Sequence, residues 1–153
     1  MPAPSPITVR PFAASDQPAA RALILAGFGE HFGVIDETLN PDLDDVASSY
    51  ADAIFLVAEC DGAIVGTGAL TREPGGDRRV RRMSVAKQHR RRGIARCLLT
   101  HLVAHARDAG CDRVVLTTNS DWPDAIAFYL ASGFTVVSQP PGGVDFARDI
   151  SRR

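Results

Sequence analysis

The stretch "SVAKQHRRRGIARCLL", residues 84–99, places four arginines around one glycine and then continues into an apolar repeat. From Gly93 onward, apolar residues recur every three or four positions until Gly110, a residue type that commonly follows the end of a helix. This spacing predicts an amphipathic helix over residues 94–109 that is entered from a basic loop. A short strand with Val80, Met83 and Val85 among arginines is expected before the loop, over residues 78–85.

The basic loop has the composition of an anion site. The N-terminus of a helix carries about half a positive charge and unpaired amide protons, and a loop that turns its own amides inward forms a nest for phosphate oxygens. Small residues at Gly93 and Ala95 would let a pyrophosphate approach those amides, and the arginines would add charge-assisted hydrogen bonds at the rim. From spacing alone, the alternative that Gly93 merely turns the chain stays equally open.

Composition favours one domain over residues 1–153, because 45% of the residues are apolar and 23% are charged. The Pro-rich residues 1–6 are expected to be disordered. No signal-peptide pattern opens the sequence and no run of about 18 apolar residues occurs, which favours a cytoplasmic location without a membrane partner. Three widely spaced cysteines predict reduced core thiols, and neither disulfides nor a metal site: Cys60, Cys97 and Cys111.

Charge is distributed unevenly, although the net charge is −1. Nine of the 17 basic residues lie in residues 78–96, whereas residues 30–52 contain seven acidic residues and no Lys or Arg. Taken alone, each run is typical of a solvated face. A nucleic-acid-binding module would use the basic run, but no Phe, Tyr or Trp lies between Phe55 and Trp122 to stack on bases, so no nucleic acid partner is expected.

The remaining segments alternate between strand and helix patterns with short connections. The dipeptide "DG" at residues 61–62 separates two apolar runs and predicts an antiparallel hairpin. The arginines of the strand over residues 78–85 are expected to point to solvent or to a ligand. The other strands are expected at residues 7–12, 53–60, 63–71, 112–119, 134–137 and 143–150, and the other helices at residues 15–29, 40–53 and 123–133.

Two of these helices carry start signals. Ser15 is a candidate N-cap of the first helix, and Asn40 with Pro41 would begin the second. Three aspartates near that second start are interpreted as helix-start residues that suit the helix dipole: Asp42, Asp44 and Asp45.

The run "MSVAKQHRRRGIARCLLTHLVAHARDAGCDRVVLTTN", residues 83–119, followed by "AIAFYLASGF", residues 125–134, resembles the core of the GNAT superfamily of acyl-CoA-dependent N-acetyltransferases. The family pattern of Arg or Gln, two residues, Gly, one residue and Gly or Ala falls on Arg90, Gly93 and Ala95. The resemblance implies an α/β (α+β) fold with a mixed, mostly antiparallel twisted sheet of six to seven strands and about four flanking helices.

The resemblance also implies acetyl-CoA as the co-substrate. The backbone of Met83, Ser84 and Val85 would bind the pantetheine arm like an added strand. A Trp occupies the place of a family Asn that touches this arm, and Asn119 lies close enough in sequence to substitute for it. The pyrophosphate would be held by the loop residues Arg90, Arg91, Arg92, Gly93, Ile94, Ala95 and Arg96.

Tyr129 occupies the place of the family's common helix tyrosine and would protonate the departing thiolate. The alternative is a core tyrosine, because its neighbours in sequence are apolar. The Val85 amide would serve the oxyanion. Many relatives carry a glutamate where this sequence has Arg79, so no general base is carried over, and Glu73 is one remaining candidate.

The expected reaction is transfer of the acetyl group to a primary amine of a small molecule, by direct attack in a ternary complex. Other candidate bases, Glu30, His31 and Glu37, lie in the acidic segment that would cover the acceptor, and these three are the expected substrate-site residues. This acidic segment would attract a cationic amine. Three alternatives stay open: a protein amine as acceptor, a non-catalytic acyl-CoA sensor, and a homodimer as the oligomeric state.

Overall fold

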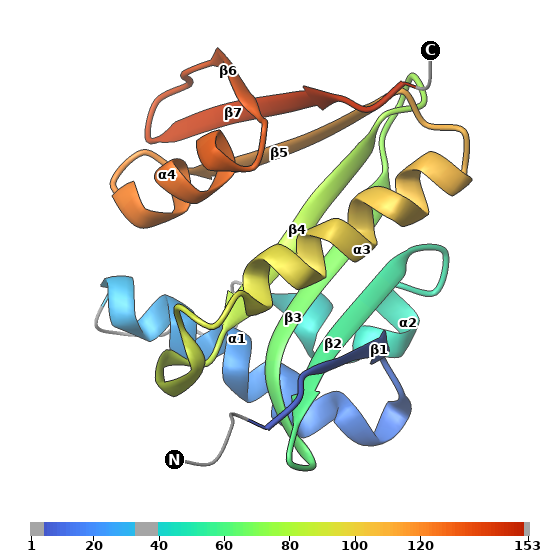
Figure 1. The fold of residues 1–153 in the computed structure, drawn as a ribbon, viewed down its shortest axis with the longest axis vertical. Coiled ribbons are helices and arrows are strands. Elements are labelled where there is room, and N and C mark those ends of the chain that lie inside the picture. The colour runs from blue at the N-terminus through green and yellow to red at the C-terminus, as the bar shows by residue number, and fades with distance from the viewer. Residues whose placement is uncertain (1–4, 33–39, 152–153) are drawn as a thin grey trace.

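One sheet of seven strands runs through the described part of the chain, in the order β1-β2-β3-β4-β5-β7-β6 (Figure 1). The structure is a computed structural model that describes residues 5–32 and 40–151, with side chains described for residues 5–27 and 40–151. The strands are β1 (Thr8–Pro11), β2 (Ile54–Cys60), β3 (Ala63–Arg72), β4 (Arg78–Val85), β5 (Arg113–Asn119), β6 (Thr135–Ser138) and β7 (Gly143–Asp149).

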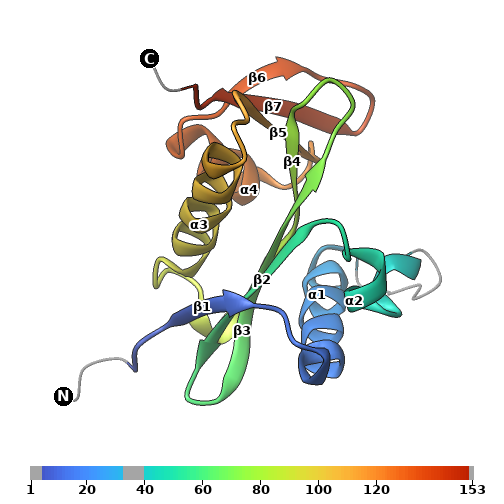
Figure 2. The same ribbon diagram turned by 90° about the vertical axis from the view of Figure 1, so that its right-hand side faces the viewer.

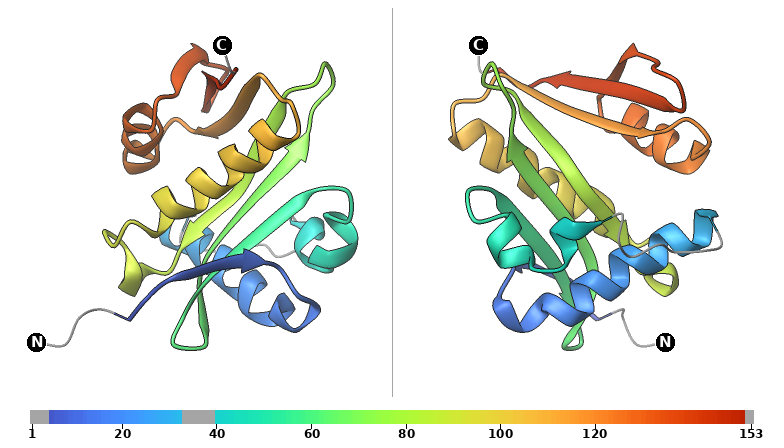
Figure 3. Two further views of the ribbon diagram at one scale, coloured as in Figure 1. Left: turned by 45° about the vertical axis from the view of Figure 1, so that its right-hand side comes forward. Right: turned by 180° about the vertical axis from the view of Figure 1, so that it is seen from behind.

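Helices cover both faces of this sheet. Figure 2 shows α3 and α4 on one side and α1 and α2 on the other, and the rear view in Figure 3 shows α1 running across the strands. The α-helices are α1 (Gln17–Phe32), α2 (Val46–Ser49), α3 (Ile94–Asp108) and α4 (Pro123–Ala131), and short 3₁₀ turns are η1 (Ala14–Asp16), η3 (Pro41–Leu43) and η4 (Lys87–His89).

The core under α3 depends on close contact between this helix and β3. A Cβ atom added to Gly66 would lie 2.9 Å from Cγ2 of Ile94, and one added to Gly68 would lie 3.1 Å from Cδ1 of Leu102. The absence of a side chain at both positions therefore lets α3 approach the sheet closely. Leu98 and Leu102 of α3 are fully buried there, as the predicted apolar repeat requires.

The opposite face of the sheet carries a smaller core under α1 and α2. Ile24 and Leu25 of α1 pack in one cluster with Val57 and Ala69 of the sheet. Tyr50, which follows α2, completes this cluster. The sheet therefore separates two apolar layers, so a ligand bound on the α3 side can meet one on the α2 side only through the sheet.

Strand pairing is antiparallel everywhere except between β4 and β5, which are parallel. The predicted hairpin is confirmed: β2 and β3 pair across Asp61 and Gly62, and both of these residues have positive φ, as the tightest two-residue turn requires. A mostly antiparallel seven-stranded sheet with helices on both faces confirms the predicted fold class.

The predicted helix starts are wrong in detail. Ser15 lies inside η1, and the Asp16 carboxylate accepts the hydrogen bond from the Ala13 N–H (2.8 Å). The predicted helix over residues 40–53 divides into η3 and α2, and Asn40 makes no side-chain cap. Of the three aspartates predicted at this helix start, only Asp45 caps α2, by accepting a hydrogen bond from the Ser48 N–H (3.2 Å).

The prediction of three core thiols holds for two of the cysteines. Cys60 and Cys111 are buried, and no cysteine of the described residues forms a disulfide. Cys97 is only half-buried on α3, with its sulfur 3.8 Å from Nδ1 of His101 one turn later. The apolar neighbours of Cys97 in sequence belong to the other face of the same helix.

Candidate functional site

The basic loop connects η4 to the N-terminus of α3, the place where the sequence predicts an anion site (Figure 1). Arg91 and Gly93 both have left-handed backbone conformations, with φ of 64° and 78°. A Cβ atom on Gly93 would meet no other atom within 4 Å, so the space beside it is open. Glycine therefore serves the turn, and the open space beside it leaves room for a ligand, so the phosphate role of Gly93 stays a prediction.

The loop directs unpaired amides into this space. The first helical hydrogen bond runs from the Cys97 N–H to the Gly93 carbonyl (3.0 Å). None of the N–H groups of residues 91–96 donates to an acceptor within residues 5–27 and 40–151. Unpaired amides at a helix N-terminus, reinforced by the helix dipole, favour an anionic oxygen ligand.

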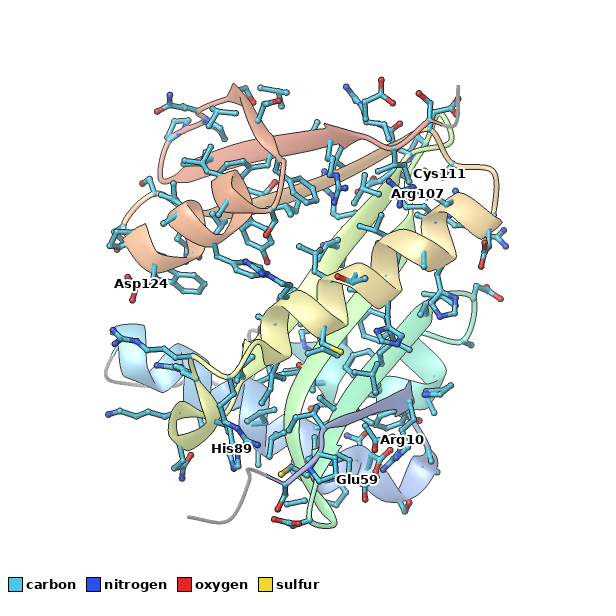
Figure 4. All side chains as sticks on the ribbon, viewed as in Figure 1. Arg10, Glu59, His89, Arg107, Cys111 and Asp124 are labelled. Carbon is cyan, nitrogen blue, oxygen red and sulfur yellow. The ribbon has the colours of Figure 1, made fainter. Side chains whose placement is uncertain are left out.

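The side chains of the loop divide into two groups. Arg90, Arg91 and Arg96 are exposed at its rim, where they can add charge to an anion site. Arg92 turns inward instead: its guanidinium donates to the Ser5 carbonyl (2.9 Å) and lies 2.7 Å from Nδ1 of His89, which Figure 4 shows in the turn before α3. Arg92 therefore fastens the loop to the chain before β1, and only its backbone is available to a ligand.

Two further loop residues set the position of the helix. Ile94 is buried (2% exposed) in the core under α3, so it fixes the first turn of this helix against the sheet. Ala95, beside it, is half-buried and small enough to leave its amide accessible. The loop is thus anchored on one side and open on the other.

A second feature of the site is the divergence of β4 from β5. Their parallel pairing is confined to Arg78 with Val114 and Arg79 with Val115, and Figure 1 shows the two strands separating beyond these pairs. Asn119 lies four residues beyond Val115, level with the part of β4 that begins at Met83. The half-buried Asn119 side chain has no hydrogen-bond partner among the described residues, so it is available to a ligand in this divergence.

A bulge in β4 sets the direction of the backbone in this gap. The register with β3 shifts between Thr67 and Ala69, and Arg82 opposite them has a left-handed φ of 55°. Such a conformation is unusual for a residue other than glycine, and the fully buried Thr67 hydroxyl stabilises it by donating to the Arg82 carbonyl (2.7 Å).

The bulge is followed by Met83, Ser84 and Val85, all half-buried. The Ala86 N–H donates to the Val65 carbonyl of β3 (2.8 Å). Because successive residues of a strand direct their N–H groups to opposite edges, the Val85 N–H faces the edge from which β5 has diverged. An extended ligand arm can therefore pair with β4 at this edge.

Tyr129 lies on α4, on the same side of the sheet as α3. It is 7% exposed and packs against the rings of Phe134 and Phe146, with centroid distances of 5.8 and 5.9 Å. Burial raises the pKa of its hydroxyl well above the ordinary value, so the group keeps its proton at neutral pH. This hydroxyl makes no hydrogen bond to any other side chain or backbone group that the structure describes. Tyr129 is thus a core residue whose hydroxyl still has a proton to donate.

On the α2 side of the sheet, an open cavity of about 600 Å³ lies beside the same divergence. We call it the arginine-lined cavity. It is bounded by strands β3, β4 and β5 and by the segment from η3 to the end of α2, with lining residues Asp42, Ser49, Tyr50, Thr71, Arg72, Arg79, Val80, Arg81, Arg82 and Thr117.

An ion pair that joins η3 to the bulge forms one wall of this cavity. The Arg82 guanidinium donates twice to the Asp42 carboxylate (2.6 and 2.9 Å), and the Tyr50 hydroxyl donates to the same carboxylate (2.6 Å). Burial would raise the pKa of Asp42, but the hydrogen bonds from Arg82 and Tyr50 outweigh it and hold that pKa below its ordinary value. The prediction that Asp42 is a helix-start residue is therefore incomplete, since its carboxylate binds the strand.

The β4 arginines also differ from expectation, since two of them bind carboxylates of the protein. Arg82 binds Asp42, and Arg79 donates to the Glu73 carboxylate and to the Thr117 hydroxyl (3.0 Å). Glu73, a candidate base, is thereby engaged in an ion pair beside the cavity. The sequence contained a signal for the pair of Arg82 with Asp42, because a basic strand and an acidic segment without basic residues are complementary in charge.

The structure does not describe the side chains of the three predicted substrate residues. Glu30 and His31 belong to the last turn of α1, but their side chains are outside the described ones. Glu37 lies outside the described residues altogether. The roles of these three residues therefore stay predictions.

Within residues 5–32 and 40–151, no helix is long and apolar enough to cross a membrane. Within the same residues, no group of three or more His, Cys, Asp or Glu side chains could hold a metal ion.

Comparison with known proteins assigns the family. Residues 19–134 match the profile of the Acetyltransferase (GNAT) family, so the chain belongs to this family and the predicted resemblance is confirmed. N-acetyltransferase family 8 member 2 of Rattus norvegicus is 37% identical over 107 residues, 65% of this chain and 47% of that protein. N-acetyltransferase 8 of Homo sapiens is 34% identical over 113 residues, 69% of this chain and 50% of that protein. The chain spans about half the length of the curated relatives it matches.

Solved structures with the same fold cover nearly the whole chain. A GNAT-family acetyltransferase of Staphylococcus aureus Mu50 has a TM-score of 0.87 and 23% identity, over 95% of this chain and 100% of that one. PaiA N-acetyltransferase of Thermoplasma acidophilum, solved in complex with coenzyme A, has a TM-score of 0.82 and 15% identity, over 94% of this chain and 99% of that one. At these identities the likeness concerns the fold.

Proposed function

We propose that this protein is an N-acetyltransferase that moves the acetyl group of acetyl-CoA to a primary amine of a small molecule. The observation that carries the proposal is the set of unpaired amides in residues 91–96, next to the edge of β4 that β5 leaves open. An anion-binding loop and an unpaired strand edge match the pyrophosphate and the amide-containing arm of one ligand. Membership of the GNAT family and the coenzyme A bound to the Thermoplasma relative support the same ligand.

In the proposed complex, the amides of the loop bind the pyrophosphate and the exposed arginines at the rim bind its outer oxygens. The pantetheine arm pairs with Met83, Ser84 and Val85, and Asn119 contacts it from the other side of the divergence. Tyr129 and the loop belong to the α3 side of the sheet, whereas the arginine-lined cavity belongs to the α2 side. The thioester would therefore meet the amine through the opening between β4 and β5.

The chemistry assigned to this geometry is direct transfer. The amine nitrogen attacks the thioester carbon, the C–N bond forms, and the Val85 N–H stabilises the negative charge that develops on the carbonyl oxygen. The C–S bond then breaks, and the Tyr129 hydroxyl gives its proton to the departing sulfur and regains one from solvent.

The attacking amine must lose a proton as well. Glu73 is poorly suited to accept it, because Arg79 already binds its carboxylate. The Arg81 guanidinium in the cavity lining, which shares the Glu73 carboxylate with Arg79, disfavours a positive charge on a bound amine and so favours the uncharged form of that amine. With the amine held in that form, water leading from the open cavity to bulk solvent is a sufficient proton acceptor.

A small acceptor is supported by the cavity, whose volume of about 600 Å³ falls in the range of small-molecule sites. The test is release of free thiol from acetyl-CoA across a panel of small amines and lysine-containing peptides, with the acetylated product identified by mass spectrometry. Transfer to small amines is expected. Transfer to peptides alone would reassign the acceptor, and tight acetyl-CoA binding without any transfer would favour the sensor alternative.

A further inference from the structure

Besides the tyrosines and cysteines, three polar side chains of the described residues are buried: Asp16, Thr67 and Thr118. The Asp16 carboxylate accepts a hydrogen bond from Arg10 (2.7 Å), and the Thr67 hydroxyl donates to the Arg82 carbonyl (2.7 Å). The Thr118 side chain on β5 is 8% exposed, and its hydroxyl has no hydrogen-bond partner among the described residues. A buried hydroxyl without a hydrogen bond lowers stability, so its presence at this place requires a reason.

Strand alternation places Thr118 on the side of the sheet that α3 and α4 cover. Val114 and Leu116 of the same strand belong to the core on this side, together with Tyr129 and Phe146. Side chains two positions apart on a strand lie on the same face, so Thr118 continues the row of Val114 and Leu116. Phe146 pairs with Leu116, and the Tyr129 ring packs against Phe146 (5.9 Å). Thr118 and Tyr129 therefore border the same part of this core.

The divergence of β4 from β5 gives the Thr118 hydroxyl an open neighbourhood. On one edge of β5, Thr118 is paired with Val144 of β7. On the other edge, the pairing with β4 ends at Val115, three residues earlier. Among the described residues, the Thr118 oxygen is not one of the side-chain polar atoms that are sealed from solvent without a hydrogen bond. The gap between the two strands is the open space beside Thr118, so a ligand in this gap can reach its hydroxyl.

The position of Thr118 along β5 decides which part of the ligand it meets. The basic loop follows the C-terminal end of β4, and β5 runs parallel to β4, so an arm that comes from the loop enters the gap at Asn119. Thr118 lies one residue, or about 3.3 Å, closer to the end of the gap that the pairing at Val115 closes. The pyrophosphate end of coenzyme A stays at the loop, so the sulfur end reaches the depth of Thr118. The polar group nearest to the sulfur in the arm is an amide.

We propose that Thr118 binds acetyl-CoA through a hydrogen bond between its hydroxyl and the amide group next to the sulfur, and that this bond sets the thioester beside Tyr129. The inference rests on the proposed function, because it takes the pantetheine arm to lie along β4. A threonine hydroxyl can donate to the amide carbonyl or accept from the amide N–H. The bond gives a partner to two polar groups that would otherwise be buried without one.

Thermal stability separates this assignment from a structural role of Thr118. Valine has nearly the shape of threonine and no hydroxyl, so Thr118→Val removes a buried polar group that has no partner in the protein, and its Tm should equal or exceed that of the wild type. Thr67→Val is the matched comparison, because it removes a buried hydroxyl that donates to the Arg82 carbonyl, and its Tm should fall by about 2–8 °C. A similar fall in Thr118→Val would make the hydroxyl structural and would overturn the assignment.

The binding experiment compares coenzyme A with a fragment that lacks the arm. Calorimetric titrations of the wild-type protein and of Thr118→Val use coenzyme A and 3′-phosphoadenosine 5′-diphosphate, which ends at the pyrophosphate. Valine leaves the ligand amide without its partner, and an unsatisfied buried polar group weakens binding by about 5-fold to 100-fold. The Kd for coenzyme A should rise by this factor, while the Kd for the fragment should not change. Thr118→Ser keeps the hydroxyl and should restore most of the coenzyme A affinity.

The contrary outcomes separate this inference from the proposed function. Unchanged coenzyme A affinity in Thr118→Val, or an equal loss for coenzyme A and the fragment, would overturn the assignment of Thr118 and leave the proposed function standing. A loss with coenzyme A that is absent with desulfo-coenzyme A would overturn the amide as the partner, in favour of the sulfur. A wild-type protein that does not bind coenzyme A would contradict the proposed function and this assignment together.

Discussion

The Tyr129 hydroxyl is the most separable part of the proposed chemistry, because its substitution leaves the packing intact. Tyr129→Phe removes one oxygen and keeps the ring contacts with Phe134 and Phe146. The hydroxyl has no partner among the described residues, so its removal breaks no hydrogen bond to them. The free energy of unfolding should therefore change by less than about 0.5 kcal/mol.

Turnover should respond very differently from stability. General acid catalysis contributes about 10²-fold, which corresponds to about 2.7 kcal/mol of transition-state stabilisation, so kcat should fall by that factor while acetyl-CoA affinity is retained. Because burial keeps the pKa of Tyr129 above its ordinary value, the loss should be the same at every pH from about 6 to 9. The assay is thiol release with a saturating amine, combined with urea unfolding of the same preparation.

The only other tyrosine of the chain provides the comparison for stability. The Tyr50 hydroxyl donates to the Asp42 carboxylate at 2.6 Å, so Tyr50→Phe should lower the free energy of unfolding by about 1.5–3 kcal/mol. Wild-type kcat in a stable Tyr129→Phe protein would refute the acid role. A loss of stability in that variant without a loss of turnover would make Tyr129 a structural residue only.

Three other predictions concern the scaffold of the site. Asp42→Ala should lower the free energy of unfolding by about 2–3 kcal/mol in urea, because it leaves the largely buried Arg82 guanidinium without its carboxylate partner. Stability of the wild-type protein should fall as pH drops below about 4, since the folded-state pKa values of Asp42 and Asp16 lie below those of the unfolded chain. This acid-dependent loss, followed by thermal unfolding between pH 7 and 3, should be smaller in Asp42→Ala. Gly66→Ala should cost about 1–3 kcal/mol and weaken acetyl-CoA binding, because the added methyl group displaces Ile94 at the start of α3; unchanged calorimetric affinity would contradict this link.

The elements that local sequence determines were predictable. A recurrence of apolar residues every three to four positions is enough to predict α3. An Asp-Gly dipeptide between two apolar runs is enough to predict the hairpin of β2 and β3. The basic loop before α3 belongs to the same class as a structural element, because its glycine and the following helix are consecutive in the chain.

The arginine-lined cavity was not predictable in this way. Arg82 and Asp42 are 40 residues apart in the sequence. Their contact depends on a β-bulge at Arg82, a position where no glycine in the sequence indicates the left-handed backbone. The sequence likewise predicts Asn40 as a helix cap, whereas in the fold its side chain accepts a hydrogen bond from Arg82 (3.1 Å). Local patterns predict that a polar side chain binds the backbone near it in sequence. In the folded protein, Asn40 and Asp42 instead bind the guanidinium of Arg82 on β4.

The central claim is that the N-terminus of α3 binds acetyl-CoA, and calorimetric titration of two glycine variants tests it most directly. Gly93 and Gly110 stand at opposite ends of α3 with φ of 78° and 79°, and a Cβ atom on either meets nothing within 4 Å. Gly93→Glu and Gly110→Glu should therefore lose similar stability, while only Gly93→Glu places a carboxylate against the pyrophosphate. The prediction is that acetyl-CoA binding disappears in Gly93→Glu and persists in Gly110→Glu; wild-type affinity in a folded Gly93→Glu protein would contradict the account.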